Sequence, residues 1–298
     1  MHDLPFVDAH VHLWDLTNLH YAWLSPPFAD DGPNGNVAPI ASTYRLEDYL
    51  REAARWNVVG LVHVEAGADP AQALDETDWV QGVAAAADRP VGIVAFAALD
   101  DPGLEQRLSA YAARSAVRGI RHIVNWHADS RRSYIPRDVT TDAAWQHGLS
   151  LLSQYDLSFD LQAYPAQFSA LAQAIARHPD LSVIVNHAGM GVDDHASWRA
   201  GMTALAALPN VSVKLSGMGF AFGGPAGEAP RRRVLDTIDL FGTDRAMIAS
   251  DFPTDRLFAG FDATLGALAE AVADFSEDER RALFARNANR IYRLGLDV

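Results

Sequence analysis

Two histidines separated by one residue lie near the start of the chain, in the stretch FVDAHVHLWD at residues 6–15. Imidazole nitrogens bind divalent metals such as zinc, and near neutral pH they also transfer protons. His10 and His12 could equally be two core histidines, because 11 histidines in 298 residues give about 0.4 His-x-His pairs by chance. The rest of the chain must decide between these readings.

Two further candidates for the same chemistry end other apolar runs. They are His187 in NHAG at 186–189 and Asp251 in SDFP at 250–253. Three imidazoles and a carboxylate would suit one divalent ion, Zn²⁺ or Mn²⁺, with a position left for water. Without a metal, Asp251 could take a proton from water while His10, His12 and His187 polarise a carbonyl group. Asp251 could instead be a helix N-cap.

Other polar residues at the ends of such runs are candidates for binding a substrate. They are Arg121, His122, Lys214, Glu65 and Tyr164, joined by Trp23 from a long connection. The three basic side chains would form a local positive patch for hydroxyl or carboxylate groups. As alternatives, Lys214 would only neutralise buried carboxylates, and Glu65 would only pack under a loop.

Eight short runs rich in β-branched residues have the composition of buried strands. They are residues 6–14, 58–67, 91–99, 117–124, 158–163, 181–189, 211–217 and 246–253. Alanine-rich stretches with helical periodicity lie between them, at 46–56, 77–87, 104–115, 143–155, 168–178 and 198–208. This alternation implies parallel strands joined by helices and predicts an α/β fold, a single-domain (β/α)8 TIM barrel. The carboxyl ends of the strands would then share one face, where barrel enzymes keep their active sites.

The whole chain, 1–298, is expected to form this one domain, since no linker or shift in composition marks a boundary. Residues 16–43 are long enough for a lid or binding loop over the active-site face. The glycine-rich residues 217–227 match no nucleotide-binding spacing and are expected to form a flexible active-site loop. Residues 278–296 are expected to form closing helices.

The first strand alternates between apolar and polar side chains. Period-2 geometry places Val7, Ala9, Val11 and Leu13 on one face, expected to be the helix side, and the polar set with His10 on the barrel axis. A closed interior is a costly place for imidazoles unless they bind something or each other.

Composition restricts the partners. The net charge of −14 argues against nucleic acid and against an anionic membrane surface. The absence of cysteine excludes disulfides and thiol nucleophiles, and no apolar run reaches the length of a membrane span. A core-like strand starting at Phe6 leaves no room for a signal peptide. We therefore expect a cytoplasmic protein with a small-molecule partner; a homo-oligomer is compatible with the sequence.

Seven segments resemble the amidohydrolase superfamily, and within it the lactonase-like group that includes sugar lactonases, pyrone dicarboxylate lactonase and sulfomuconolactone hydrolase. They are VDAHVHLWD at 7–15, YAWL at 21–24, RGIRH at 118–122, NHAG at 186–189, VKLSG at 213–217, ASDFP at 249–253 and NANRIY at 287–292. The segments follow in order across nearly the whole chain. The resemblance implies a (β/α)8 barrel in which His10, His12, His187 and Asp251 hold divalent metal.

Two departures from the superfamily pattern refine this expectation. No lysine on the fourth strand is suited to bridge two metals, so at most one ion is expected, and some lactonases of the group act without any metal. The related decarboxylase branch often has Glu where this chain has Asp8, which slightly favours hydrolysis over decarboxylation.

The predicted activity is hydrolysis of a cyclic ester, either a sugar lactone or a lactone that carries a carboxylate. Asp251 would be the general base, with His10, His12 and His187 as metal ligands or oxyanion stabilisers. Two alternatives stay open at this point. One is a metal-dependent decarboxylase or hydratase of an unsaturated or aromatic acid, and the other is a non-catalytic barrel that binds an organic acid.

Overall fold

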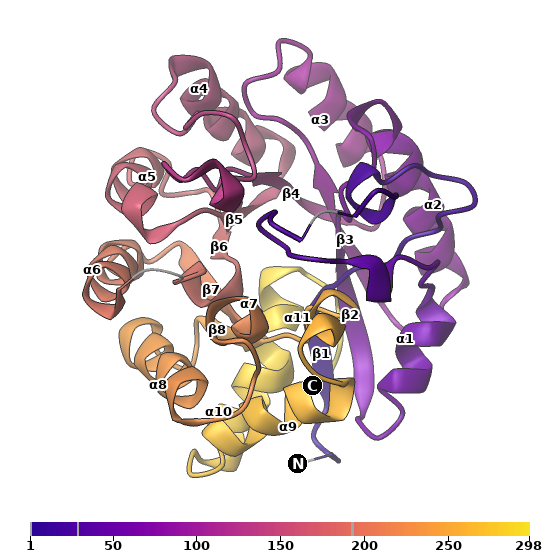
Figure 1. Cartoon of the computed structure of the whole chain (residues 1–298), viewed down its shortest axis with the longest axis vertical. Helices are drawn as coiled ribbons and strands as arrows, with labels where there is room; N and C mark the ends of the chain where they lie inside the picture. The colour runs from indigo at the N-terminus through magenta and orange to yellow at the C-terminus, as the bar shows by residue number, and fades with distance from the viewer. Residues whose placement is uncertain (1, 29, 192–193) are drawn as a thin grey trace.

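The chain forms a barrel of eight parallel strands, in the order β1 to β8, surrounded by helices (Figure 1). The computed structural model describes residues 2–28, 30–191 and 194–298. The strands are β1 (Phe6–Val11), β2 (Val58–Val64), β3 (Val91–Phe96), β4 (Val117–Ile123), β5 (Ser158–Gln162), β6 (Val183–Val185), β7 (Val211–Leu215) and β8 (Ala246–Ile248). The predicted (β/α)8 barrel is confirmed.

Eleven α-helices occur in the described residues, and most lie around the barrel. They are α1 (Leu46–Glu52), α2 (Ala73–Ala86), α3 (Leu104–Ala112), α4 (Ala143–Leu152), α5 (Phe168–Ile175), α6 (His195–Ala206), α7 (Met218–Phe222), α8 (Glu228–Phe241), α9 (Phe261–Ala271), α10 (Glu277–Arg281) and α11 (Asn287–Ile291). A π-helical turn, Ala282–Arg286, joins the last two. No helix of the described residues is long and apolar enough to cross a membrane.

The helices differ from the sequence prediction in two places. Helices α8 and α9 were not among the predicted helices, although the buried Val234, Ile238 and Phe241 of α8 follow a helical spacing. The glycine-rich segment 217–227 is not wholly a loop, because it contains the short helix α7.

The strands β6 and β8 are shorter than predicted, because the chain leaves the sheet before its last polar residues. His187 and Asp251 have left-handed backbone angles, with φ of 54° and 58°. A strand cannot continue through such residues. His187 and Asp251 therefore lie on the loops that follow β6 and β8, whereas His10 lies on β1 itself.

The barrel closes between β1 and the segment after β8. The backbone N–H of Asp251 donates to the carbonyl of His10 at 2.9 Å, and the N–H of His12 donates to the carbonyl of Phe252 at 2.8 Å. The carboxylate of Asp8 accepts the backbone N–H of Ser250 at 2.9 Å. These bonds join the first and last strands of the sheet and fix the position of His10 and His12 relative to Asp251.

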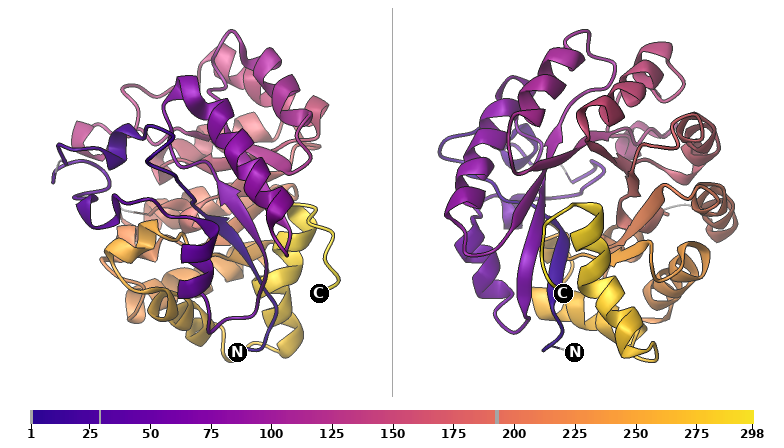
Figure 2. Two further views of the ribbon diagram at one scale, coloured as in Figure 1. Left: turned by 90° about the vertical axis from the view of Figure 1, so that its right-hand side faces the viewer. Right: turned by 180° about the vertical axis from the view of Figure 1, so that it is seen from behind.

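The packing of β1 corrects the expected alternation. Val11 and Leu13 lie in the main cluster, which fills the space between the sheet and the helices. Val7 and Ala9 instead belong to a second buried cluster that includes Tyr292 of the C-terminal segment. The pairing of β1 with β2 shifts register twice, so period-2 alternation does not hold along the whole strand. The C-terminal segment lies on the side of the barrel away from the long N-terminal loop (Figure 2).

A buried ion pair lies inside the barrel. Nζ of Lys214 is 2.5 Å from a carboxylate oxygen of Asp160, and neither side chain is exposed. The hydroxyl of Tyr292 lies 3.0 Å from both oxygens of the same carboxylate. Each charge is therefore compensated inside the barrel.

Removing one partner of this pair should be costly. Lys214→Met leaves Asp160 buried without a counter-charge, and we expect a loss of about 3–5 kcal/mol in unfolding free energy, measured by urea denaturation. The double variant Lys214→Met/Asp160→Asn removes both charges and keeps an acceptor for Tyr292, so it should recover most of that loss. A single variant as stable as the parent protein would contradict this account.

Candidate active site

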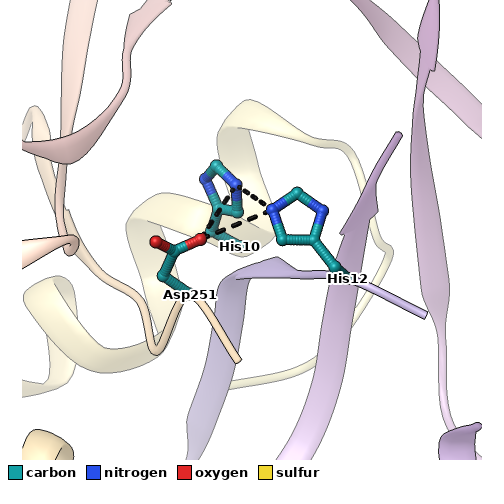
Figure 3. A group of neighbouring side chains, drawn as sticks. All are labelled: His10, His12 and Asp251. Carbon is teal, nitrogen blue, oxygen red and sulfur yellow. Dashed lines mark hydrogen bonds and ion pairs between the residues drawn. The ribbon is translucent and has the colours of Figure 1, made fainter. Parts of the chain in front are cut away.

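His10, His12 and Asp251 form a compact buried group at the point where the barrel closes (Figure 3). The Nε2 atoms of the two histidines are 3.1 Å apart. Oδ1 of Asp251 lies 3.5 Å from Nε2 of His10 and 3.4 Å from Nε2 of His12. Neither carboxylate oxygen of Asp251 has a hydrogen-bond partner in the described part of the chain. Three potential ligand atoms therefore face a common point.

His187 lies directly beside this group. Its Nδ1 is 3.7 Å from Oδ2 of Asp251 and 3.0 Å from the hydroxyl oxygen of Ser216. Its ring centroid is 4.6 Å from that of His10. The structure thus brings together all four residues that the sequence singled out, with His187 at the edge of the three-residue group.

The charges of these residues follow from their surroundings. Burial lowers the pKa of His187 to about 4, although the carboxylate of Asp251 opposes the shift. Burial also holds the pKa of His10 well below 6.5, assisted by the positive charge of Lys214. Burial acts to raise the pKa of Asp251, but His187, His12 and Arg121 outweigh it and the net pKa is lowered. At neutral pH the site therefore holds an ionised Asp251 beside neutral His10 and His187.

The hydrogen bonds indicate where the imidazole protons sit. Nδ1 of His12 lies 2.8 Å from the carbonyl of Val64, which can only accept, so this nitrogen carries the proton and Nε2 has a free lone pair. Nδ1 of His10 faces the ammonium group of Lys214 at 3.5 Å, which can only donate. The proton of His10 then lies on Nε2 and points toward Nε2 of His12.

The group fits a divalent ion in spacing and in donor type. Ligand atoms about 2.1 Å from a tetrahedral zinc ion lie about 3.4 Å from one another, close to the three separations found here. His12 has the arrangement typical of a metal ligand, since its other nitrogen donates to a carbonyl. His10 would need to move its proton to Nδ1 to become a ligand as well.

A pocket of about 210 Å³ opens above this group. Its lining residues are His12, Trp23, Asn34, Ala66, Gly67, Arg121, Ile123, Tyr134, Gln162, His187, Met190, Phe220, Asp251 and Thr254. Of the predicted substrate-binding residues, Trp23 and Arg121 line it. The pocket has polar groups at its base and aromatic rings on its walls.

Arg121 is held by a buried network. Its Nε donates to a carboxylate oxygen of Glu65 at 2.6 Å, and another of its nitrogens donates to the backbone carbonyl of Glu65 at 2.6 Å. A third nitrogen donates to the side-chain oxygen of Gln162 at 3.1 Å. Glu65 does not line the pocket itself; it neutralises and orients the arginine that does.

Besides Glu65, three other predicted substrate-binding residues do not line the pocket. Adjacent residues of a strand point to opposite sides, so His122 cannot share the face of Arg121; its Nδ1 accepts the backbone N–H of Leu99 at 3.1 Å. Lys214 is paired with Asp160, and its Nζ is 3.5 Å from Nδ1 of His10. It therefore has the alternative role considered from the sequence, which is to neutralise a buried carboxylate. The Tyr164 hydroxyl donates to the carbonyl of Arg132 at 2.7 Å, in the segment between β4 and α4.

The sequence missed the residues that the long loops bring to the pocket. The hydroxyl of Tyr134 donates to the side-chain oxygen of Asn34 at 2.5 Å, which joins two loops 100 residues apart. Loop length predicted that residues 16–43 cover the active-site face, and 16–43 do contribute Trp23 and Asn34. No pattern in the sequence marks which residue of a loop turns inward.

A family model described as amidohydrolase matches residues 7–294. The chain belongs to the amidohydrolase family. The resemblance inferred from its sequence is thereby confirmed.

This amidohydrolase is similar to proteins of known name over nearly its whole length. An uncharacterised protein, y4mH, of Sinorhizobium fredii is 38% identical, over 99% of this chain and 100% of that protein. An L-fucono-1,5-lactonase of Burkholderia multivorans is 29% identical, over 97% of this chain and 96% of its own. A crystal structure of an amidohydrolase from Burkholderia multivorans with bound zinc is 25% identical, with a TM-score of 0.79 and coverage of 97% and 99%.

One wall of the amidohydrolase pocket rests on a buried acid. The carboxyl of Glu76 accepts the backbone N–H of Ala66 at 3.0 Å, and Ala66 and Gly67 line the pocket. Burial, followed by the negative charge of Glu65, raises the pKa of Glu76 from 4.5 to about 8. The folded protein therefore holds this proton more tightly than the unfolded chain does.

This shift predicts a pH-dependent stability. The contribution of Glu76 is fully present below pH 4.5 and is lost as the pH rises through about 8. Glu76→Gln should remove this loss, so its unfolding free energy relative to the parent should grow by up to about 1.4 kcal/mol per pH unit across that window. Urea denaturation at several pH values measures it, with the exposed Glu47→Gln as control. A difference that does not change with pH would contradict the assignment.

Proposed function

We propose that this amidohydrolase hydrolyses a neutral, polyhydroxylated lactone, that is, a sugar lactone. The family and the lactonase names of its relatives support a hydrolase that acts on ester bonds. The volume of the pocket, about 210 Å³, suits a substrate of one ring. Amide and hydroxyl groups of Gln162, Asn34 and Tyr134 would bind the hydroxyl groups of such a ring, and Trp23 would cover its apolar face.

The charge balance of the pocket favours a neutral lactone over a carboxylated one as the substrate. Arg121 is the only arginine or lysine among the described lining residues, and its charge is balanced by Glu65 at 2.6 Å. Lys214, the second predicted cation, is balanced by Asp160. The positive patch expected from the sequence is thus neutralised, and a substrate carboxylate would meet no unpaired cation.

Asp251 is proposed to act as the general base. Its ionised carboxylate, free of hydrogen bonds in the described residues, takes a proton from water as the water oxygen attacks the lactone carbonyl. We assign the Ser216 hydroxyl, 3.0 Å from Nδ1 of His187, as the donor of that hydrogen bond, so that the Nε2–H of His187 stabilises the oxyanion. When the ester C–O bond breaks, the proton on Asp251 passes to the ring oxygen, and the products are a hydroxyl group and a carboxylic acid.

A divalent ion would be held by His10, His12 and Asp251. When bound, it supplies a water of lowered pKa and a positive charge near the carbonyl oxygen. The roles of Asp251 and His187 in moving and stabilising charge do not depend on it.

Replacement of Asp251 tests the mechanism. Asp251→Asn cannot accept a proton, and we expect kcat to fall by about 10²–10⁴-fold while the protein stays folded. Asp255→Asn is the matched control. Asp255 is also buried, and burial with the nearby charge of Asp251 raises its pKa well above 3.8, so that Asn replaces a neutral acid. Near-normal turnover by Asp251→Asn would rule out the mechanism.

A pH-indicator assay on a lactone panel tests the substrate class. We expect proton release from neutral 1,4- and 1,5-sugar lactones and little from a pyrone dicarboxylate, in metal-quantified protein with and without chelator. Glu65→Gln uncovers the charge of Arg121 and should shift the kcat/KM ratio toward the carboxylated lactone by about tenfold, or about 1.4 kcal/mol. Carbon dioxide release from an aromatic acid would favour a decarboxylase, and ligand binding without turnover would favour a binding protein.

A further inference from the structure

Four consecutive residues after β6 have left-handed backbone conformations. The φ angles of His187, Ala188, Gly189 and Met190 are 54°, 46°, 76° and 41°. Two backbone hydrogen bonds close the turn, from Gly189 to the carbonyl of Asn186 at 3.0 Å and from Met190 to that of His187 at 2.9 Å. The turn presents both His187 and Met190 to the active-site pocket.

This conformation is unfavourable for the side chains present. In a left-handed turn Cβ comes too close to the following carbonyl oxygen, and only glycine visits this region freely. Three of the four residues carry a Cβ. Such backbone strain persists only where surrounding contacts hold it, so the contacts of this turn must supply that support.

Trp198 on α6 provides the most direct contact. Its indole N–H donates to the carbonyl of Ala188 at 2.7 Å, and its side chain is fully buried. A Cβ on Gly189 would meet Met202 at 2.5 Å and Phe168 at 3.1 Å, so side chains of α6 and α5 also pack tightly against the turn. Trp198 is the member of this set that bonds to the strained backbone itself.

Arg233 on α8 extends the support. Its guanidinium lies 4.0 Å from the ring centroid of Trp198, and two of its nitrogens lie 3.4 Å from the carbonyl of Gly191. Neither Trp198 nor Arg233 lines the active-site pocket. Both therefore act on the site only through the turn.

We infer that Trp198 is a positioning residue of the active site, which holds Ala188 in its left-handed conformation and so keeps His187 in place. The predicted effect of Trp198 on catalysis rests on the proposed function. Its predicted effect on the turn at 187–190 does not. Loss of the indole N–H should release the strain and let His187 depart from the position in which it would stabilise the oxyanion.

Trp198→Phe keeps an aromatic ring but removes the N–H donor, together with some ring volume that the control below also loses. We expect kcat for the lactone substrate to fall at least tenfold with KM nearly unchanged, because His187 is assigned to the transition state. Trp145→Phe is the matched control: Trp145 is fully buried on α4, and its indole N–H has no partner in the described residues. Its kcat should stay within twofold of the parent.

A second substitution distinguishes positioning from mere packing. Glycine adopts the conformation of Ala188 without strain. The double variant Trp198→Phe/Ala188→Gly should therefore recover kcat to within about threefold of Ala188→Gly alone. Failure of this rescue, or an unchanged kcat in Trp198→Phe, would overturn the inference.

Hydrogen exchange separates this inference from the proposed function. The amides of Gly189 and Met190 should exchange at least tenfold faster in Trp198→Phe than in the parent, and Ala188→Gly should reverse the change. This readout holds even if no lactone is turned over. Unchanged exchange at these two amides would overturn the inference whatever the substrate.

Discussion

The seam between β1 and the end of β8 is the constraint on which the site depends. Two backbone hydrogen bonds and the Asp8 carboxylate join the segment after β8 to the first strand, so the two ends of the sheet meet there. His10 and Asp251 owe their 3.5 Å separation to this closure. A barrel with an open seam would keep its core but lose the convergence of its imidazoles and its carboxylate. The site is thus a consequence of closing the barrel rather than an addition to it.

Backbone strain is concentrated beside this seam. His187 and Asp251 both have left-handed conformations, and they lie two residues after the end of β6 and three residues after the end of β8, respectively. The bend in the backbone turns each side chain toward the active-site group. In a regular strand the same side chain would lie farther along the strand. The fold supplies the compensation: a closed hydrogen-bond ladder supports Asp251, while packing from α5, α6 and α8 supports the turn at His187.

The sequence was informative where chemistry and periodicity coincide. Residue type at the strand ends identified His10, His12, His187 and Asp251, because imidazoles and carboxylates in a closed barrel must have a partner. The sequence was less informative about the direction in which each side chain points. His122 was grouped with Arg121 although adjacent strand residues face opposite sides, and Asn34 and Tyr134 were missed because loop conformation depends on contacts between distant segments. Helix α8 was also missed, although its buried Val234, Ile238 and Phe241 follow the spacing of one helix face.

The same reasoning explains why so many charges lie inside one barrel. Arg121 and Lys214 place positive charge on two sides of Asp251, yet each has its own carboxylate, Glu65 or Asp160, and therefore does not pair with Asp251. Their positive charges favour the ionised form of Asp251 and so oppose the effect of its burial. The two pairs also leave Asp251 without an arginine or lysine partner among the described residues. An unpaired carboxylate next to two neutral imidazoles can accept either a proton or a cation, and this dual capacity is what a hydrolytic site needs.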